Sequence, residues 1–369
     1  MRILFLHPSF PGQFRYLAPS LANKPQNEVV FLTTRSAGQL SGVRKLCYDM
    51  PRPVHPQTHR YVQPLEKAVL QGQAAYRAAQ GLKQDGFIPD IIYGHAGSGV
   101  MLFMKDLFPK AELWGFFEWF YHAHGTDADF DASEKLTVDD EARIRILNAS
   151  ILLDLHQCNQ GVCPTLWQKS QFPKEYASKL KVIPDQIDTT FFYPEPTAQM
   201  VLPTSKLNLS HVAEIVTYIA RGLEPYRGFL QFMEALSIRQ RESPHCHAVI
   251  VGEDHVFYGR SHPSGDTYKQ ISLKQFELDL SRVHFVGMPP MGEYRTILQA
   301  SSVHVHLCRP FLLSWSLLEA MACGCRIVAS NTAPVLEVFS GYENGILTDF
   351  FSPQNISSCV DQLLKYESN

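Results

Sequence analysis

The sequence predicts an α/β protein made of two doubly wound domains, each with a parallel sheet. Short apolar segments rich in valine and isoleucine recur along the chain, separated by stretches whose apolar residues repeat at helical spacing. This series starts twice, once before and once after a proline-rich segment at residues 181–196. Residues 302–331 read as strand, helix, strand, which is the repeating unit of such folds.

The composition is that of a globular chain long enough for two domains. It has 369 residues, of which 45% are hydrophobic and 19% charged, and a net charge of -3. That charge favours neither nucleic acid nor an anionic membrane, so no nucleic-acid partner is expected and any anion must be held by a local site. Pro8 and Pro11 interrupt the first apolar run too early for a signal peptide, and no run approaches the roughly 20 residues of a membrane span. We expect a cytoplasmic protein, with peripheral membrane or partner-protein contact left open.

Cysteines and histidines are numerous but poorly arranged for a metal. The close cysteine pairs are Cys158 with Cys163 and Cys323 with Cys325, and neither has a second pair at zinc-ligand spacing. Free thiols in a reducing compartment fit this distribution better than disulfides. Histidines lie two apart at three places, without a third ligand, so the sequence predicts no metal site. These pairs are His122 with His124, His245 with His247, and His304 with His306.

The first half of the chain predicts alternating strands and helices. Gly12 falls in the first strand-to-helix turn, where a ligand can approach the backbone closely, although a plain tight turn is an equal alternative. The small residues 96–99 follow another strand and admit either a sugar or phosphate, or close helix packing. The expected elements are strands at 2–7, 29–35, 89–95 and from 112, helices at 15–24, 64–85 and 134–157, a loop at 36–63, and a strand, turn and helix within 161–173.

Residues 112–131 form the most aromatic stretch of the chain. They begin as a buried strand and leave Glu118, His122 and His124 near its carboxyl end. Aromatic faces next to hydrogen-bonding groups suit a sugar ring, although such clusters are more often core.

The second half begins a new series of strands. We place the domain boundary in the proline-rich segment, which gives domains at residues 1–195 and 196–369. Two doubly wound domains in one chain predict a cleft between them as the default active site. The expected strands are 216–221, 248–252, 283–287, 303–307, 326–330 and 345–349.

The turn at residues 308–313 leads from the strand VHVHL to the helix LLSWSLLEAMA. A phosphate bound there would meet free backbone N–H groups and the positive end of the helix dipole. Glu319 stands among the apolar residues of this helix. On these residues alone, a solvent-facing position is the favoured reading of Glu319.

Taken together, five segments resemble the retaining glycosyltransferases of family 4, whose GT-B architecture consists of two Rossmann-like domains facing a cleft. Their order and approximate spacing match over nearly the whole chain, and the N-terminal half matches mainly in pattern. The resemblance implies transfer of a sugar from a nucleotide diphosphate sugar. The segments are ARGLEPYRGF, GE at 252–253, VHFVG followed by a helix with Tyr294, VIPDQIDTTFFYP, and LLEAMACGCRIVASNTAPVLEV.

The resemblance also implies roles for individual residues. Arg221 and Arg227 match an Arg and a Lys that grip the diphosphate, and two guanidinium groups with a helix N-terminus would stabilise the leaving group without a metal. Glu319 matches the carboxylate that binds the ribose hydroxyls. Asp188 matches an inter-domain Asp with a structural or a ligand role. Further donor-side positions are Glu253, Val286, Leu312, Leu313 and Ser314.

Three features depart from the family pattern. Phe311 stands where relatives place a carboxylate against the donor sugar. In the first domain, Glu118 replaces the usual histidine, unless His122 or His124 takes that place. The sequence ends with LLKYESN, whereas relatives usually continue through further helices, the last of which crosses back to the first domain, so we expect either a short version or loss of that crossover.

The leading hypothesis is a retaining, metal-independent hexosyltransferase without a permanently bound cofactor. Its donor is a UDP- or GDP-sugar, and its acceptor is unidentified: a glycan, a lipid-linked glycan, a protein or a small molecule. Glu118 and His122 are the first-domain candidates for catalysis, beside Arg221 and Arg227. The alternatives are a GT-B scaffold or binding subunit that has lost turnover, motivated by Phe311, and a sugar-nucleotide epimerase, which shares the fold and ligand.

Overall fold

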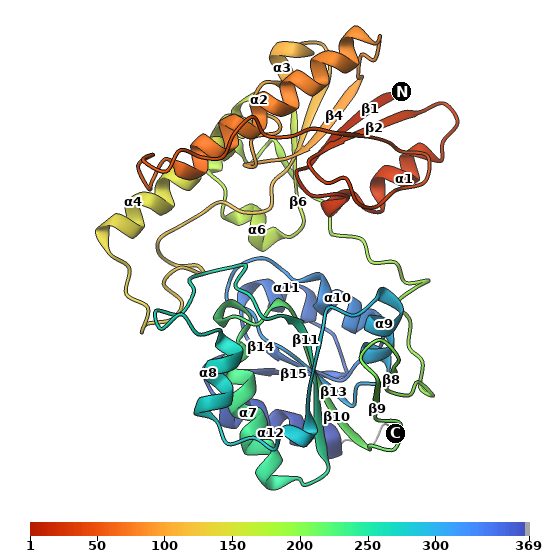
Figure 1. Cartoon of the computed structure of the whole chain (residues 1–369), viewed down its shortest axis with the longest axis vertical. Helices are drawn as coiled ribbons and strands as arrows, with labels where there is room; N and C mark the ends of the chain where they lie inside the picture. The colour runs from red at the N-terminus through yellow and green to blue at the C-terminus, as the bar shows by residue number, and fades with distance from the viewer. Residues whose placement is uncertain (366–369) are drawn as a thin grey trace. The chain divides into compact units, whose positions relative to one another are not determined.

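The computed structural model describes residues 1–365 and divides the chain into two compact units. The first unit is Met1–Gln186 and the second is Ile187–Asn369 (Figure 1). The boundary predicted after residue 195 falls inside the second unit. Each unit contains one parallel sheet with helices on both faces, which confirms the predicted fold class.

The sheet of the first unit has the order β3-β2-β1-β4-β5-β6-β7, with parallel pairing throughout. The order reverses at β1, which places the turn after β1 beside the ends of β4 and β5. The strands are β1 Arg2–Leu6, β2 Glu28–Thr33, β3 Arg44–Cys47, β4 Ile91–His95, β5 Glu112–Phe116, β6 Gln160–Cys163 and β7 Leu180–Val182. The helices are η1 Gly12–Phe14, α1 Leu17–Ala22, α2 Gln63–Gln84, α3 Met104–Leu107, α4 Val138–Leu147, α5 Ala149–Gln157, α6 Leu166–Ser170 and η2 Lys174–Tyr176.

Alternating side chains of β1 face two different hydrophobic layers. Leu4 and Leu6 pack with residues of α2, α3 and α5, whereas Ile3 and Phe5 pack with η1 and α1. Helices therefore cover both faces, and strands buried on both sides need continuous apolar runs such as ILFL in β1.

Two predictions for this unit were wrong in detail. The predicted loop at 36–63 contains the edge strand β3, whose sequence RKLC has no apolar run to mark it. The predicted helix at 134–157 is divided into α4 and α5 at Asn148. The Asn148 side chain accepts a hydrogen bond from the backbone N–H of Tyr121 and donates one to its carbonyl oxygen, both over 2.8 Å. A residue tied to another segment in this way fixes the break.

The sheet of the second unit has the order β12-β11-β10-β13-β14-β15 and is also parallel throughout. A small antiparallel pair, β8 with β9, precedes it and was not predicted, since each strand has only two residues. The strands are β8 Val201–Leu202, β9 Leu207–Asn208, β10 Glu214–Gly222, β11 Cys246–Glu253, β12 Val283–Gly287, β13 Val303–His306, β14 Ile327–Ser330 and β15 Gly345–Thr348. The helices are η3 Pro225–Arg227, α7 Phe229–Glu242, α8 Tyr268–Gln275, η4 Leu280–Arg282, α9 Met291–Gln299, α10 Trp315–Ala322, α11 Ala333–Phe339 and α12 Pro353–Lys365.

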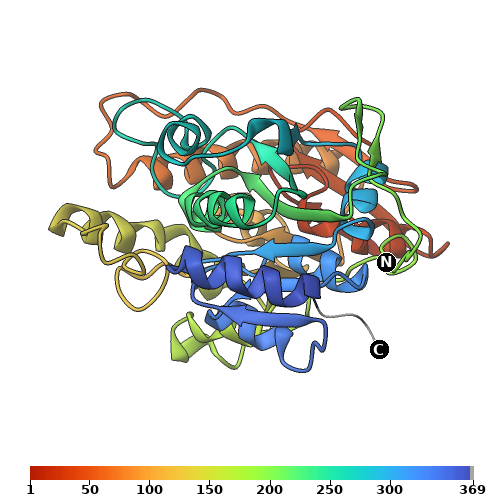
Figure 2. The ribbon, with the colours of Figure 1, turned by 90° about the horizontal axis from the view of Figure 1, so that it is seen from below.

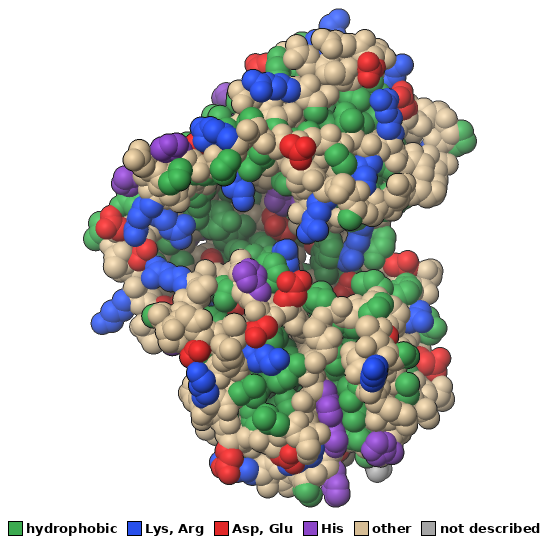
Figure 3. Space-filling model, viewed as in Figure 1, with side chains coloured by type: hydrophobic (Ala, Val, Ile, Leu, Met, Phe, Trp, Pro, Cys, Tyr) green, Lys and Arg blue, Asp and Glu red, His purple; other side chains and the backbone are tan. Residues whose placement is uncertain are grey.

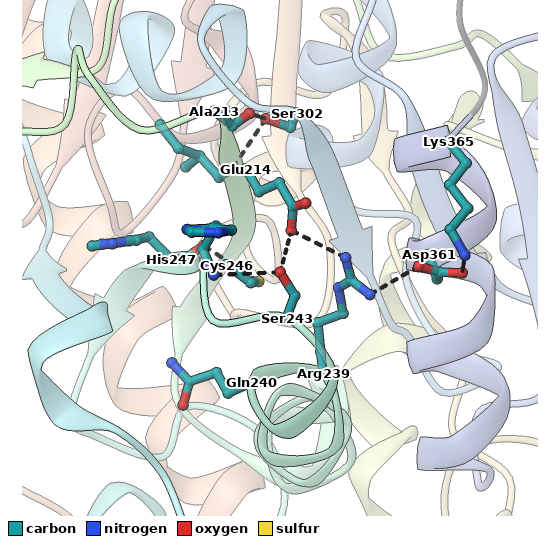
Figure 4. Close-up of polar contacts among 12 residues, drawn as sticks. Ala213, Glu214, Arg239, Gln240, Ser243, Cys246, His247, Ser302, Asp361 and Lys365 are labelled. Carbon is teal, nitrogen blue, oxygen red and sulfur yellow. Dashed lines mark hydrogen bonds and ion pairs between the residues drawn. The ribbon is translucent and has the colours of Figure 1, made fainter.

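Helices α7 and α12 cover one face of this sheet, drawn in green and dark blue in Figure 2. Helices α9, α10 and α11 pack on the other face. A buried charge network joins the first pair: Arg239 on α7 lies 3.0 Å from Glu214 at the start of β10 and 2.9 Å from Asp361 on α12 (Figure 4). The two carboxylates partly offset the cost of removing the buried guanidinium from water.

The first residues of the second unit are fixed to α9. Arg295 donates a hydrogen bond to the carbonyl oxygen of Phe191 over 3.2 Å, and Gln299 donates one to that of Tyr193 over 2.8 Å. The side chain of Phe192 is buried and its ring packs against that of Tyr294. The segment that leads out of the first unit thus belongs to the core of the second.

The structure also locates the cysteines and histidines. All eight cysteines are free thiols. His304 and His306 are buried on one face of β13. His247 on β11 and His284 on β12 stack across these neighbouring strands. Several histidine side chains gather at the lower end of the second unit in Figure 3. Within residues 1–365, no group of three or more His, Cys, Asp or Glu side chains is placed to hold a metal ion. In the same residues, no helix has the length and apolarity to cross a membrane.

Candidate active site

The turn from β10 to α7 requires a glycine at position 228. Gly228 has φ +64°, and a Cβ there would lie 2.6 Å from the Cβ of Leu307 in the turn after β13. This close approach brings the loop ARGLEPYRG of β10 against the loop between β13 and α10. Both loops follow the carboxyl ends of neighbouring strands, where ligands bind in such sheets.

Arg227 lies between these two loops. Its Nη1 donates hydrogen bonds to the Cys308 thiol over 2.9 Å and to the carbonyl oxygen of Leu312 over 3.2 Å. The guanidinium is thereby held at the turn that precedes α10, where the sequence predicted a phosphate.

Glu224 is fully buried and ties a second loop to the same place. One carboxylate oxygen accepts hydrogen bonds from the backbone N–H groups of Phe257 and Tyr258, the latter over 2.9 Å. The guanidinium of Arg221 lies 4.0 Å from the centre of the Phe257 ring, and that of Arg227 lies 5.8 Å from the Tyr258 ring. Burial raises the pKa of Glu224. Glu224 therefore positions the aromatic rings on which both arginines rest.

Phe311 belongs to an aromatic cluster. Its ring lies 5.6 Å from that of Tyr226 and 5.3 Å from that of Tyr258, with 5% of the residue exposed. The ring fills space between the turn after β10 that carries Tyr226 and the loop held by Glu224.

The start of α10 offers backbone donors. Ser314 precedes the helix, and its hydroxyl oxygen lies 2.8 Å from that of Ser316. Among the described residues, the backbone N–H groups of Leu312, Leu313 and Ser314 have no hydrogen-bond acceptor. Three free N–H groups in the turn that leads into a helix N-terminus can attract an anion.

Glu319 is buried on α10, with 5% exposed, so the solvent-facing reading is wrong. Tyr294 on α9 donates its phenolic hydrogen to Glu319 Oε2 over 2.6 Å. A buried carboxylate requires such donors, because the cost of removing its charge from water must be offset. The tyrosine sets the direction of this carboxylate.

The remaining donor-side candidates lie at the ends of β11 and β12 or in the segment before the sheet. Glu253 is exposed, and its carbonyl oxygen accepts a hydrogen bond from Leu223 over 3.0 Å. Val286 is half-buried against the core. Asp188 accepts hydrogen bonds from the N–H and hydroxyl of Thr190 and from the N–H of Phe191, which is the structural turn role.

In the first unit, Gly12 makes room for a buried histidine. A Cβ on Gly12 would lie 2.6 Å from the ring of His7, the residue that follows β1. His7 Nδ1 accepts the backbone N–H of Ser9 over 2.8 Å, and burial, followed by the nearby His95, lowers the pKa of His7 to about 3. The neutral ring must then carry its proton on Nε2, which donates to Gln13 Oε1 over 2.7 Å.

Glu118 completes this network. It accepts a hydrogen bond from Gln13 Nε2 over 2.8 Å, and His95 Nε2 lies 3.4 Å from its other oxygen. Burial alone would raise the pKa of Glu118, but His95, Gln13 and His7 outweigh it and the pKa is lowered. The side chain is 30% exposed. Glu118 is thus a charged and accessible carboxylate at the strand ends of the first sheet.

His122 is separate from this network. Its Nε2 donates to the carbonyl oxygen of Gln171 over 2.8 Å, and its ring lines a pocket beside α4. The small-residue turn at 96–99 is closely packed, because a Cβ on Gly99 would lie 1.9 Å from the carbonyl oxygen of Ala68. The polar cluster of His7, Gln13, His95 and Glu118 therefore includes neither His122 nor this turn.

Comparisons with known families agree with this arrangement. Residues 25–192 match the model described as "Glycosyl transferase family 4 group", and residues 205–369 match "Glycosyl transferases group 1". The chain belongs to the group 1 glycosyltransferases. No curated protein sequence matches this glycosyltransferase significantly.

Solved structures with the same fold include known GT-B proteins. HepE from Anabaena, in complex with UDP-glucose, aligns with TM-score 0.67 and 16% identity over 99% of this chain and 90% of its own. Sucrose-phosphate synthase from Thermosynechococcus elongatus aligns with TM-score 0.66, 16% identity and the same coverage. The catalytic domain of starch synthase IV from Arabidopsis thaliana, bound to ADP and acarbose, aligns with TM-score 0.65 and 14% identity over 99% of this chain and 92% of its own. These likenesses establish the GT-B fold of this glycosyltransferase.

Sequence reasoning missed four members of the two clusters, His7, Gln13, His95 and Glu224. A usable signal existed for the histidines, because His7 follows β1 and His95 ends β4, and these two buried strands are neighbours in the sheet. No signal connected Glu224 to the loop at Phe257, since that contact depends on the fold alone.

Proposed function

We propose that this glycosyltransferase moves a sugar from a UDP- or GDP-sugar to an acceptor hydroxyl with retention at the anomeric carbon. The bond between that carbon and the diphosphate oxygen breaks, and the acceptor oxygen bonds on the same face. The acceptor proton passes to the leaving diphosphate.

One observation carries the proposal: the guanidinium of Arg227 is held at the loop where Leu312, Leu313 and Ser314 present free N–H groups. A fixed cation and aligned backbone donors stabilise the charge that develops on a diphosphate leaving group. Arg221, exposed on the Phe257 ring, supplies a second cation. Neither contribution requires a metal ion.

The carboxylates are assigned to hydroxyl groups. Glu319, oriented by Tyr294, accepts hydrogen bonds from the ribose. With Phe311 enclosed by Tyr226 and Tyr258, Glu118 is proposed to take over the contact with the donor sugar. Its role is positioning of the sugar.

The first test is calorimetric titration of the wild-type protein with UDP, GDP and ADP, which ranks the bases. The second is release of UDP or GDP from the matching sugar nucleotides, with and without candidate acceptors and with EDTA. We expect binding of one diphosphate and acceptor-dependent release that persists in EDTA. Absence of binding to every diphosphate would refute the proposal. Binding without release for any donor and acceptor pair would indicate a subunit that has lost turnover, and a new sugar nucleotide formed without acceptor would indicate an epimerase.

A further inference from the structure

A pocket on the first unit lies outside the residues assigned above to the donor. Its volume is about 510 Å³, within the range of small-molecule sites. The segment after β5 forms one wall, and α4 and α5 form the other. The apolar part of the lining comes from Phe120, Tyr121, Val138, Ile144 and Leu152.

Some apolar side chains of the lining are exposed to solvent and do not contribute to the hydrophobic core. Val138 is 84% exposed and Leu152 is 38% exposed, although both could be polar at no cost to the core. A hollow of this size with exposed apolar side chains is typical of a site that binds an apolar group of a ligand. A sugar alone would require more polar groups.

The charged residues in and around the pocket differ in whether they have an ion-pair partner. His124 lies 3.4 Å from Asp129 and 3.3 Å from Glu141, so both acids face the same ring. Arg145, one turn after Glu141 on α4, makes no ion pair within the part of the chain that the structure describes. Among the described residues, the pocket therefore offers one cation without an ion-pair partner, Arg145, beside an apolar wall.

The pocket wall is attached to the segment that carries Glu118. Tyr121 is three residues beyond Glu118, which is roughly 10 Å of extended chain at most. Asn148 holds both backbone groups of Tyr121, and Gln168 donates to the carbonyl oxygen of Glu118 over 2.7 Å. A molecule seated in the pocket would thus lie against the continuation of the Glu118 strand.

We propose that this pocket binds the acceptor, and that the acceptor is a small amphipathic molecule with an apolar or aromatic body and an anionic group that pairs with Arg145. Its identity as the acceptor rests on the glycosyltransferase function proposed above. Its ability to bind an amphipathic anion rests on the pocket alone.

The binding test uses two fluorescent dyes of similar shape. Anilinonaphthalene sulfonate has an aromatic body with an anion, and phenylnaphthylamine has a similar body without one. We expect Arg145→Ala to weaken binding of the sulfonate about three- to tenfold and to leave the neutral dye unchanged. Ala142→Trp, which fills the pocket, should weaken both dyes. Arg143→Ala, on the same helix but outside the lining, is the matched control.

A further variant guards against misfolding of the filled pocket. Val138→Glu changes an exposed side chain at the mouth, and its negative charge should weaken the sulfonate more than the neutral dye. Saturating UDP should displace neither dye. Displacement by UDP, or equal loss of both dyes in Arg145→Ala, would overturn the proposal. The proposal would also be overturned if Arg145→Ala, Ala142→Trp and Val138→Glu all left dye binding unchanged. If Val138→Glu then reduced sedimentation of the protein with phosphatidylglycerol vesicles, the exposed apolar side chains would form a membrane-binding surface instead.

An activity measurement separates this inference from the function on which it rests. Once a donor and acceptor pair is known, Ala142→Trp should raise the KM for the acceptor and leave UDP affinity unchanged. Transfer that is indifferent to Ala142→Trp and Arg145→Ala would refute the acceptor pocket while the glycosyltransferase function stands. Dye binding with the expected pattern, but without transfer for any pair, would refute the function and leave the pocket as a binding site.

Discussion

Tyr294 and Glu319 form a buried hydrogen bond of 2.6 Å between α9 and α10. The tyrosine occupies one carboxylate oxygen and fixes the plane of the group. A carboxylate oriented in this way is suited to accept hydrogen bonds from hydroxyl groups such as those proposed for a ribose.

Glu319→Gln is therefore expected to weaken binding of the ribonucleoside diphosphate more than that of its 2′-deoxy counterpart. The amide replaces one acceptor oxygen by a donor, which penalises a ligand that must donate a hydroxyl proton. Titration of both ligands against both proteins measures the difference, and Tyr294→Phe should show the same selectivity to a smaller extent. Equal losses for the two ligands would leave Glu319 with a structural role only.

Arg227→Ala and Arg221→Ala should each weaken binding of the nucleoside diphosphate. Loss of one charge-assisted contact costs about 1.5–3 kcal/mol, or roughly tenfold or more in affinity. The effect should be smaller for Arg221, because its guanidinium is exposed to water and partly screened. If neither variant changes the affinity, the phosphates are bound elsewhere.

Glu224 allows a test with opposite signs. Glu224→Ala removes the acceptor for the N–H groups of Phe257 and Tyr258, so the loop should lose order and diphosphate affinity should fall roughly tenfold. Glu224→Gln keeps an acceptor oxygen and removes a negative charge near both arginines, so affinity should be equal to that of the wild type or higher. Similar losses in both variants would contradict an ordering role.

Glu118→Gln should lower turnover and leave affinity for the bare nucleoside diphosphate nearly unchanged, since it is assigned to the sugar. Gln13→Ala removes a donor that holds the same carboxylate, and should lower turnover less. Steady-state kinetics with titration of UDP or GDP separates the two quantities. If Glu118→Gln turns over as fast as the wild type, a group other than Glu118 contacts the donor sugar.

The second unit should lose stability in mild acid. Burial lowers the pKa of His304 to about 4, whereas an unfolded histidine titrates near 6.5. Between pH 6.5 and pH 4 this histidine is protonated in the unfolded chain but neutral in the folded chain. Its contribution to the free energy of unfolding is therefore fully present above pH 6.5 and falls by up to about 3 kcal/mol as the pH drops to 4. His304→Gln should flatten the dependence of the unfolding free energy on pH in this window. His306 is shifted in the same direction and should retain part of the slope.

The strands were predictable because each sheet is buried on both sides. AVIVG is a continuous apolar run, and the polar residues His304, His306 and Ser330 within VHVHL and RIVAS are buried as well. All three segments are strands. RKLC in β3 lies at a sheet edge, where pairing to β2 suffices without an apolar pattern, and it was missed.

The candidate site was predictable only where one local segment carries it. Arg227 and Glu319 each belong to a motif with a spacing of its own. The polar cluster of the first unit combines His7, Gln13, His95 and Glu118 from three strand ends, and only the strand order brings them together. The replacement of a carboxylate by Phe311 was visible, but its two aromatic neighbours come from separate loops.

The attachment of residues 187–194 to α9 decides where the polypeptide can be divided. A fragment that begins at residue 196 would lack Phe192, a fully buried ring whose loss from a core costs about 3–5 kcal/mol. Because that ring packs on Tyr294, the same cut would disturb the partner of Glu319. A fragment that begins at Ile187 keeps both contacts, so it is the fragment on which the proposed nucleotide binding should be tested.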